Sequence, residues 1–114
     1  MIGMEQSSMA EARFYVLMAL SNGEKSKVEV LDYICNHTRR RVSVWPGMLC
    51  TILDQLRESG MVTSGARNSC GAVYALTERG RFAYGEALER LFACASDAMR
   101  AAAPTNVAAQ RAVV

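Results

Sequence analysis

The sequence has little of what a metal centre or a catalytic site needs. His37 is the only histidine, and the cysteines are far apart, with no two at CxxC spacing. We therefore expect no metal site and no cofactor. His37 has no evident nucleophile and carboxylate partners, and no phosphate-binding glycine loop is present, so we expect no enzyme. The cysteines are predicted to be free thiols, as is usual in a reducing compartment: Cys35, Cys50, Cys70 and Cys94.

Long apolar runs are also missing. No segment approaches the roughly 18 consecutive apolar residues of a membrane helix. The first ten residues lack a basic start followed by an apolar run, which favours a cytoplasmic protein without a signal peptide. With 114 residues, 51% of them hydrophobic, the chain fits one small domain. Because small domains bury a modest share of their surface, a second copy would stabilise it.

Charge is unevenly distributed although the net charge is only +2. Residues 25–81 hold nine basic and five acidic residues, whereas the rest of the chain holds four basic and six acidic ones. A basic middle between acidic flanks suits a central nucleic-acid surface. Solvated surface charge explains the same numbers equally well.

Apolar periodicity predicts two helices in the first third of the chain. The first runs from Met9 to Leu20 and ends at Asn22–Gly23. Its inward stripe is predicted to be Met9, Arg13, Val16, Leu17 and Leu20. The second begins after Ser26, with Glu29 three residues later in the capping-box pattern, and ends near His37. A short β-branched piece follows at residues 42–44.

A third helix is predicted to start between Ser43 and Pro46, because proline is tolerated in a first turn. It has an inward stripe of Leu49, Ile52, Leu53 and Leu56. Strands are expected at residues 61–64 and 72–76, joined by a polar loop over 65–71. Thr77 should cap a last helix that ends near Pro104.

This element order predicts a mainly α fold with a small β-hairpin: a winged helix-turn-helix followed by a long C-terminal dimerisation helix. We assign residues 1–76 to the winged helix-turn-helix, 77–103 to the dimerisation helix and 104–114 to a flexible tail. The last helix has more apolar surface than a small core requires, which favours a homodimer. Its predicted interface residues are Tyr84, Leu88, Leu91, Phe92, Ala95 and Met99.

Four segments resemble the PadR-like transcriptional regulators. They are Phe14–Leu20, Pro46–Leu49, Leu53–Val62 and Val73–Arg81, the last containing Tyr-x-Leu-Thr-x-x-Gly. The similarity extends from about Ala10 to Met99. The resemblance implies a dimeric repressor that binds double-stranded DNA. It also implies, as in some members, a small aromatic effector near the dimer interface.

The chain departs from this family in the predicted recognition helix. Cys50 occupies a position where the family usually has a tyrosine, and Trp45 one where it often has a serine. Asp54 and Gln55 stand where basic residues are common. The lower positive charge supports an alternative function, a winged-helix module that binds protein and little or no DNA.

Within this fold we predict which residues contact DNA. Thr51, Gln55 and Met48 would face the bases of the major groove, and the wing tip and neighbouring cations would contact phosphates. The full predicted set is Lys25, Lys27, Arg39, Arg40, Arg41, Met48, Thr51, Gln55, Arg67 and Asn68. A dimer would then read a pseudo-palindromic operator. Trp45 is expected to cover the core below the third helix or, alternatively, to line a ligand pocket.

Overall fold

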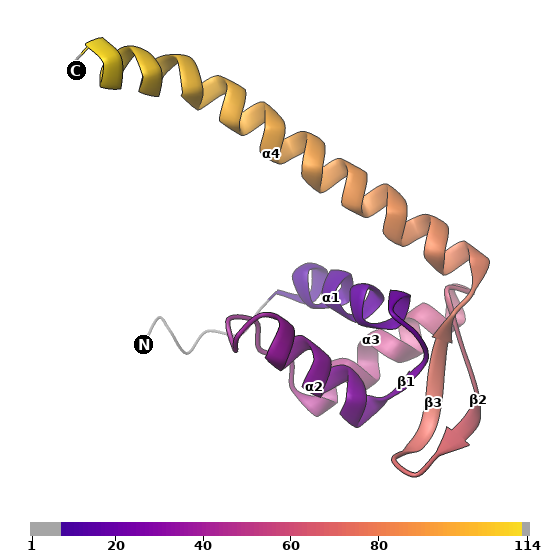
Figure 1. Ribbon diagram of the computed structural model, residues 1–114. Helices are drawn as coiled ribbons and strands as arrows, with labels where there is room; N and C mark the ends of the chain where they lie inside the picture. Colours follow the sequence, from indigo (N-terminus) through magenta and orange to yellow (C-terminus); the bar gives the residue numbers. More distant parts are fainter. Residues whose placement is uncertain (1–7, 113–114) are drawn as a thin grey trace. The chain divides into compact units, whose positions relative to one another are not determined.

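The computed structural model describes residues 8–112, with the backbone alone at Ala66 and over 103–112. The chain divides into two compact units, one ending at Tyr84 and one beginning at Gly85. The elements, labelled in Figure 1, are α1 (Met9–Ser21), β1 (Lys25–Ser26), α2 (Lys27–His37), α3 (Pro46–Glu58), β2 (Val62–Asn68), β3 (Gly71–Leu76) and α4 (Glu78–Ala112). The predicted winged-helix element order is confirmed, with one strand, β1, that we did not predict.

The core of the first unit is formed by the apolar stripes of α1, α2 and α3 together with the strands. All four predicted inward residues of α3 are buried, and the loop residue Val42 joins them. The buried α1 residues include Ala12 rather than the predicted Arg13, which is half-buried. The large side chains that are fully buried in the core of the first unit are Leu20, Ile34, Leu49, Ile52, Leu53, Val16, Val30 and Val62.

The predicted capping box at the start of α2 is present. The Ser26 hydroxyl accepts from the Glu29 N–H at 3.2 Å, and the Glu29 carboxylate accepts from the Ser26 N–H at 2.8 Å. Ser26 also belongs to β1, which pairs antiparallel with β3 through Lys25–Tyr74 and Ser26–Val73. A two-residue strand has no periodicity of its own, which explains why the sequence did not reveal it.

The wing is the antiparallel pair β2–β3, and the sheet order is β1-β3-β2. The seven-residue loop predicted over 65–71 is wrong, because β2 continues to Asn68 and leaves a turn at Ser69–Cys70. The register shifts between Ser64 and Arg67, as in a β-bulge. Such a bulge accommodates an extra residue within a continuing strand, so the polar composition of the segment misled the prediction.

α4 begins as predicted, with the Thr77 hydroxyl accepting from the Gly80 N–H at 3.0 Å. It does not end near Pro104 but continues to Ala112. A proline removes one backbone donor and bends a helix without necessarily ending it, and alanine, the strongest helix former, is frequent around it. Residues 113–114 of the predicted tail lie outside the described residues. No helix in the described chain combines the length and apolar character needed to cross a membrane.

Both α2 and α3 end in a Schellman motif, which satisfies their last carbonyls. After α3, Gly60 has the left-handed φ of 81° that the motif requires, and the Met61 N–H donates to Leu56 O at 2.8 Å. After α2 the same position is occupied by Arg39, with φ 54°, and Arg40 follows with φ 66°. Two consecutive non-glycine residues in this conformation are costly, so this turn stores backbone strain.

Candidate nucleic-acid interface

The surface of α3 opposite its buried stripe is accessible. Thr51, Asp54 and Gln55 are exposed there, and Cys50 at its edge is half-buried. At about 100° per residue, the buried stripe and these positions lie on different sides of the helix. An accessible helix face beside a two-stranded wing has the dimensions to enter a major groove.

Two predicted base-reading residues already have hydrogen bonds within the chain. The Thr51 hydroxyl donates to Gly47 O at 3.2 Å, so its methyl group remains the part available for an apolar contact. The Gln55 side-chain oxygen accepts from the Arg13 guanidinium at 3.2 Å. Arg13, which we assigned to the inward stripe of α1, therefore places a cation beside α3. Sequence spacing could not reveal this contact, because the two residues are 42 positions apart.

The negative charge of Asp54, which stands where the PadR-like family often has a basic residue, is partly compensated. Its carboxylate lies 3.5 Å from the Arg57 guanidinium, one turn further along α3. Both side chains are more than half exposed, so the pair is weak and its partners can exchange. The charge of Asp54 is thus screened at this surface, and Arg57 adds a cation that the sequence prediction left out.

The start of α2 meets α3 and the wing at one point. Interactions with the side chains of Cys50 on α3, and then of Tyr74 on β3, raise the pKa of the Lys27 ammonium group. Lys27 therefore stays fully charged beside the outer surface of α3. A phosphate contact from Lys27 stays a prediction.

Lys25 is engaged differently. Its ammonium group donates to Ala19 O at 2.8 Å and to Gly23 O at 3.3 Å, and it lies 5.0 Å from the centre of the Tyr33 ring. Partial burial lowers its pKa, and the nearby Glu29 charge opposes that shift. These contacts stabilise the carbonyl end of α1. A phosphate contact from Lys25 remains a prediction.

The wing tip carries both residues predicted to contact DNA. Arg67 is exposed, whereas the Asn68 amide donates to the Glu29 carboxylate at 3.2 Å and its oxygen accepts from the Cys70 N–H at 2.8 Å. The backbone N–H of Ser26, followed by Asn68, lowers the pKa of Glu29 by stabilising its charged form. Asn68 thus ties the wing to the start of α2, and Arg67 is the cation at the tip.

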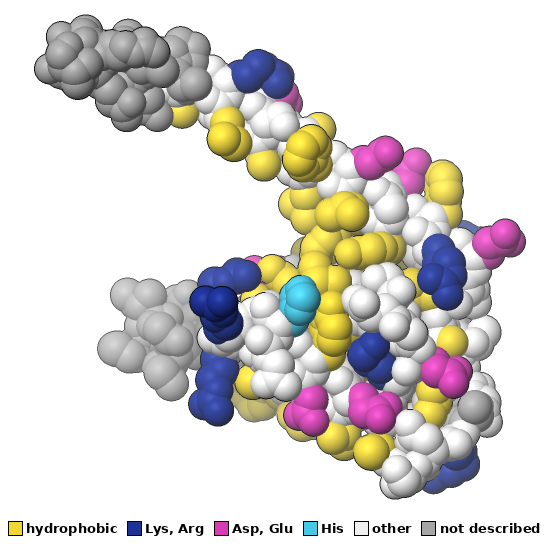
Figure 2. Space-filling model, viewed as in Figure 1, with side chains coloured by type: hydrophobic (Ala, Val, Ile, Leu, Met, Phe, Trp, Pro, Cys, Tyr) yellow, Lys and Arg dark blue, Asp and Glu magenta, His cyan; other side chains and the backbone are white. Residues whose placement is uncertain are grey.

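The arginine triplet lies in the turn after α2. Arg39, Arg40 and Arg41 are all exposed, and Figure 2 shows dark blue side chains gathered beside that end of α2. His37, the last residue of α2, is exposed and stacks on Tyr33 with ring centres 4.9 Å apart. Its position at a helix end is the one predicted. Phosphate contacts from the triplet stay a prediction.

The prediction that Trp45 covers the core is wrong. Trp45 is 51% exposed and is the N-cap residue of α3, with Pro46 in the first turn. Because the inner face of α3 begins at Leu49, a residue before the first turn lies beyond the core. Trp45 instead lines a shallow, largely open pocket of about 300 Å³ with Met9, Gly47, Met48 and Thr51.

The apolar residues predicted for a dimer interface fall into two groups. Tyr84 belongs to the first unit and packs on Phe14, with ring centres 5.5 Å apart. The others belong to the second unit, and the large ones are markedly exposed: Leu88 46%, Leu91 52%, Phe92 73% and Met99 70%. Ala95 is exposed as well. Tyr84 therefore already has a partner within its own chain.

All four cysteines are free thiols; Cys35 and Cys50 are half-buried, and Cys70 and Cys94 are exposed. In the part of the chain that the structure describes, no three histidine, cysteine or carboxylate side chains gather as a metal site would need.

Comparison with known proteins shows which fold this is. No protein-family model matches the chain, and no match is found among curated proteins. Similar solved structures include a transcriptional regulator from Clostridium thermocellum, with TM-score 0.69, 17% identity and coverage of 77% of this chain and 89% of that one. F93 from STIV, a winged-helix DNA-binding protein, has TM-score 0.63, 21% identity and coverage of 75% and 91%.

The chain has the winged-helix fold. A PadR family transcription regulator from Clostridium difficile is also similar, with TM-score 0.62, 17% identity and coverage of 77% and 93%. This likeness agrees with the resemblance seen in the sequence segments. At these identities the structural likeness establishes the fold, and function has to be argued from the surface of this chain.

Proposed function

We propose that the protein is a cytoplasmic, sequence-specific DNA-binding regulator of transcription, a dimeric repressor of PadR-like type. The observation that carries the proposal is the surroundings of the outer surface of α3. Cations from two other elements border it, Arg13 from α1 and Lys27 from the start of α2, and a third, Arg67, is exposed on the wing. The similar winged-helix structures are described as regulators or DNA-binding proteins, which supports binding rather than catalysis.

In this proposal α3 enters the major groove and the cations hold phosphates. The exposed methyl group of Thr51 would contact a thymine methyl, and the amide nitrogen of Gln55 would donate to a base edge. Arg13 donates to the side-chain oxygen of Gln55, which favours one orientation of that amide before DNA binds. Fixing a side chain in advance reduces the entropy lost on binding.

Dimerisation is proposed through the second unit. The exposed side chains of Leu88, Leu91, Phe92 and Met99 recur at three-, four- and seven-residue steps, as on an amphipathic helix that packs against a partner. A second copy would cover this surface. The two α3 helices of the resulting dimer would read a pseudo-palindromic operator. A small aromatic effector near such an interface is implied by the family resemblance alone.

Two classes of variant separate the proposed roles in one assay. Arg67→Ala should weaken binding on specific and random duplexes alike and lower the slope of log affinity against log salt by about one. Thr51→Ala, which removes the methyl contact, should weaken the preferred duplex alone. The readout is fluorescence anisotropy at several salt concentrations. Equal losses on both duplexes for both variants would contradict the assignment of base reading to α3.

A second function, binding to protein rather than DNA, is favoured by one observation. Asp54 and Glu58, one turn apart, are both exposed on the outer part of α3, and Trp45 is exposed at its start. Acidic side chains repel phosphates, whereas an exposed tryptophan is typical of protein interfaces. Asp54→Asn distinguishes the two functions: it should tighten DNA binding if α3 enters the groove and leave it unchanged if α3 does not.

A further inference from the structure

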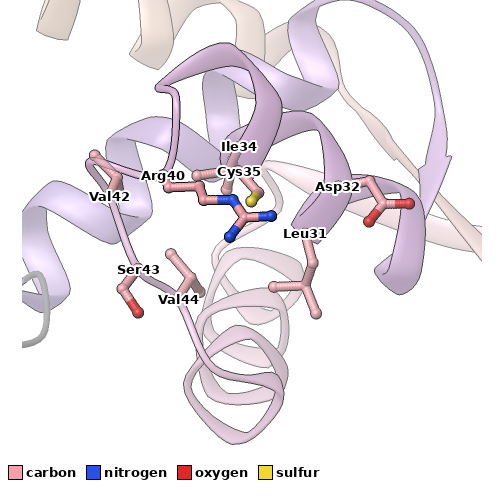
Figure 3. Close-up of a pocket in the computed structure, with 8 residues that line it drawn as sticks. All are labelled: Leu31, Asp32, Ile34, Cys35, Arg40, Val42, Ser43 and Val44. Atoms are coloured by element: carbon pink, nitrogen blue, oxygen red, sulfur yellow. The ribbon is translucent and has the colours of Figure 1, made fainter.

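A pocket separate from the proposed DNA surface lies between α2 and the segment that leads to α3. It has a volume of about 300 Å³, at the lower end of the range for small-molecule sites. Four of its eight lining residues are aliphatic: Leu31 and Ile34 from α2, and Val42 and Val44 from the following segment. The other four are Asp32, Cys35, Arg40 and Ser43. Figure 3 shows these residues around the pocket.

One cation lies at this pocket. Figure 3 shows the Arg40 side chain reaching from the turn after α2 across the pocket toward Leu31. The left-handed backbone at Arg40, φ 66°, belongs to the strained turn. Asp32 also lines the pocket. The described side chains form two ion pairs, Arg57–Asp54 and Arg100–Asp97, and neither engages Arg40.

The wall of the pocket is held in place before any ligand arrives. Thr38 is buried, and its hydroxyl both donates to Ile34 O at 2.7 Å and accepts from the Val42 N–H at 3.2 Å. The Arg40 N–H donates to Cys35 O at 2.8 Å. These bonds fix the turn to the end of α2. A ligand would therefore meet a formed cavity, which keeps the entropic cost of binding low.

We infer that this pocket binds a small organic acid, one carboxylate joined to an apolar body. The guanidinium of Arg40 offers parallel N–H donors that match the two oxygens of a carboxylate. The apolar walls would cover the rest of the molecule, where water is released from hydrocarbon surface. A neutral or cationic molecule of the same shape would lack the charged hydrogen bonds.

This assignment gives Arg40 a ligand other than the DNA phosphate that we predicted for it. It also suggests a route to regulation, because Val44 lines the pocket and precedes Trp45, the N-cap of α3. Movement of this segment would alter the start of the helix proposed to read DNA. That regulatory step rests on the proposed function, whereas the binding site does not.

The test uses the full-length protein without DNA, so its failure is distinct from a failure of DNA binding. Trp45, the only tryptophan, follows the pocket residue Val44 and serves as a fluorescence reporter. The probes are cyclohexanecarboxylate and its amide, cyclohexanecarboxamide, which differ in charge and hardly in shape. Isothermal titration calorimetry provides a second readout that does not depend on the reporter. We expect saturable carboxylate binding and amide binding at least tenfold weaker.

The matched variants are Arg40→Gln and Arg41→Gln, neighbouring exposed arginines of which only Arg40 lines the pocket. Arg40→Gln should weaken carboxylate binding at least tenfold, and Arg41→Gln less than twofold. If Arg40→Gln unfolds, Arg40→Lys replaces it. Arg40→Lys should lose an intermediate amount of carboxylate affinity, because lysine keeps the positive charge but lacks the parallel N–H donors of the guanidinium. Equal affinity for acid and amide, equal effects of the two glutamine variants, or no binding at millimolar concentration would overturn the inference.

Discussion

Gly80, in the first turn of α4, is packed against backbone. A Cβ built there would lie 2.1 Å from the carbonyl oxygen of Met61 and 3.0 Å from a methyl group of Leu76. That carbonyl also accepts from the Thr77 N–H at 3.0 Å, which fixes the junction between β3 and α4. Ordinary contacts begin near 3.4 Å, so Gly80→Ala would have to move backbone by roughly 1 Å.

The expected free-energy change follows from two opposing terms. Alanine is favoured over glycine in a helix by about 1 kcal/mol, and overpacking costs about 1–3 kcal/mol. Because the clash is with a hydrogen-bonded carbonyl rather than a flexible side chain, we place the cost at or above the upper end. Gly80→Ala should then destabilise the protein by about 2 kcal/mol net and lower its Tm by roughly 10 °C.

Gly85 supplies the matched control, since it lies in the same helix and a Cβ there meets nothing within 4 Å. Gly85→Ala should stabilise the protein by up to about 1 kcal/mol. Both variants are compared with the unmodified chain by thermal and urea unfolding at one protein concentration, because a dimer unfolds in a concentration-dependent way. A Gly80→Ala protein as stable as Gly85→Ala would refute the packing argument.

Three further predictions concern other parts of the chain. Arg39→Gly should stabilise the protein by up to about 1 kcal/mol in urea unfolding, because glycine adopts the left-handed φ of 54° without strain; a loss of stability would contradict the Schellman assignment. The pKa of Glu29 is lowered in the folded protein, so its charge stabilises the fold above the ordinary value of 4.5 and loses this effect as pH falls through the folded pKa. Glu29→Gln should therefore be less stable than the unmodified chain at pH 6 and equally stable well below pH 4, and a difference that does not change with pH would argue against the charge. Leu91→Asp should convert a dimer into monomers in sedimentation velocity by placing a charge in the proposed interface, whereas a monomeric unmodified protein at micromolar concentration would exclude that interface.

Much of the fold could be predicted because its signals are local. The capping box at Ser26, the leucine stripe of α3 and the Thr77 cap each depend on residues three or four positions apart, and each is confirmed. The glycine of the Tyr-x-Leu-Thr-x-x-Gly segment also acquires a reason. Gly80 allows the start of α4 to approach the carbonyl of Met61, a contact that the sequence pattern marks without explaining.

The features that were missed depend on contacts distant in sequence or on exceptions to local rules. Arg13 reaches Gln55 across 42 positions, and β1 exists only through its pairing with β3. β2 runs through the polar segment 65–68, and α4 continues past Pro104. The pocket beside Arg40 arises where two arginines take a backbone conformation usually occupied by glycine, a choice that composition does not reveal.

Salt-dependent DNA binding tests the central claim most directly. A duplex selected by the protein from a random library and a scrambled duplex of equal length are titrated by fluorescence anisotropy at several salt concentrations. We predict that log affinity falls linearly with log salt on both duplexes and that the selected duplex binds at least about 10³-fold more tightly. Equal affinity for the two duplexes, or no salt-dependent binding to either, would contradict the account and favour a protein partner for α3.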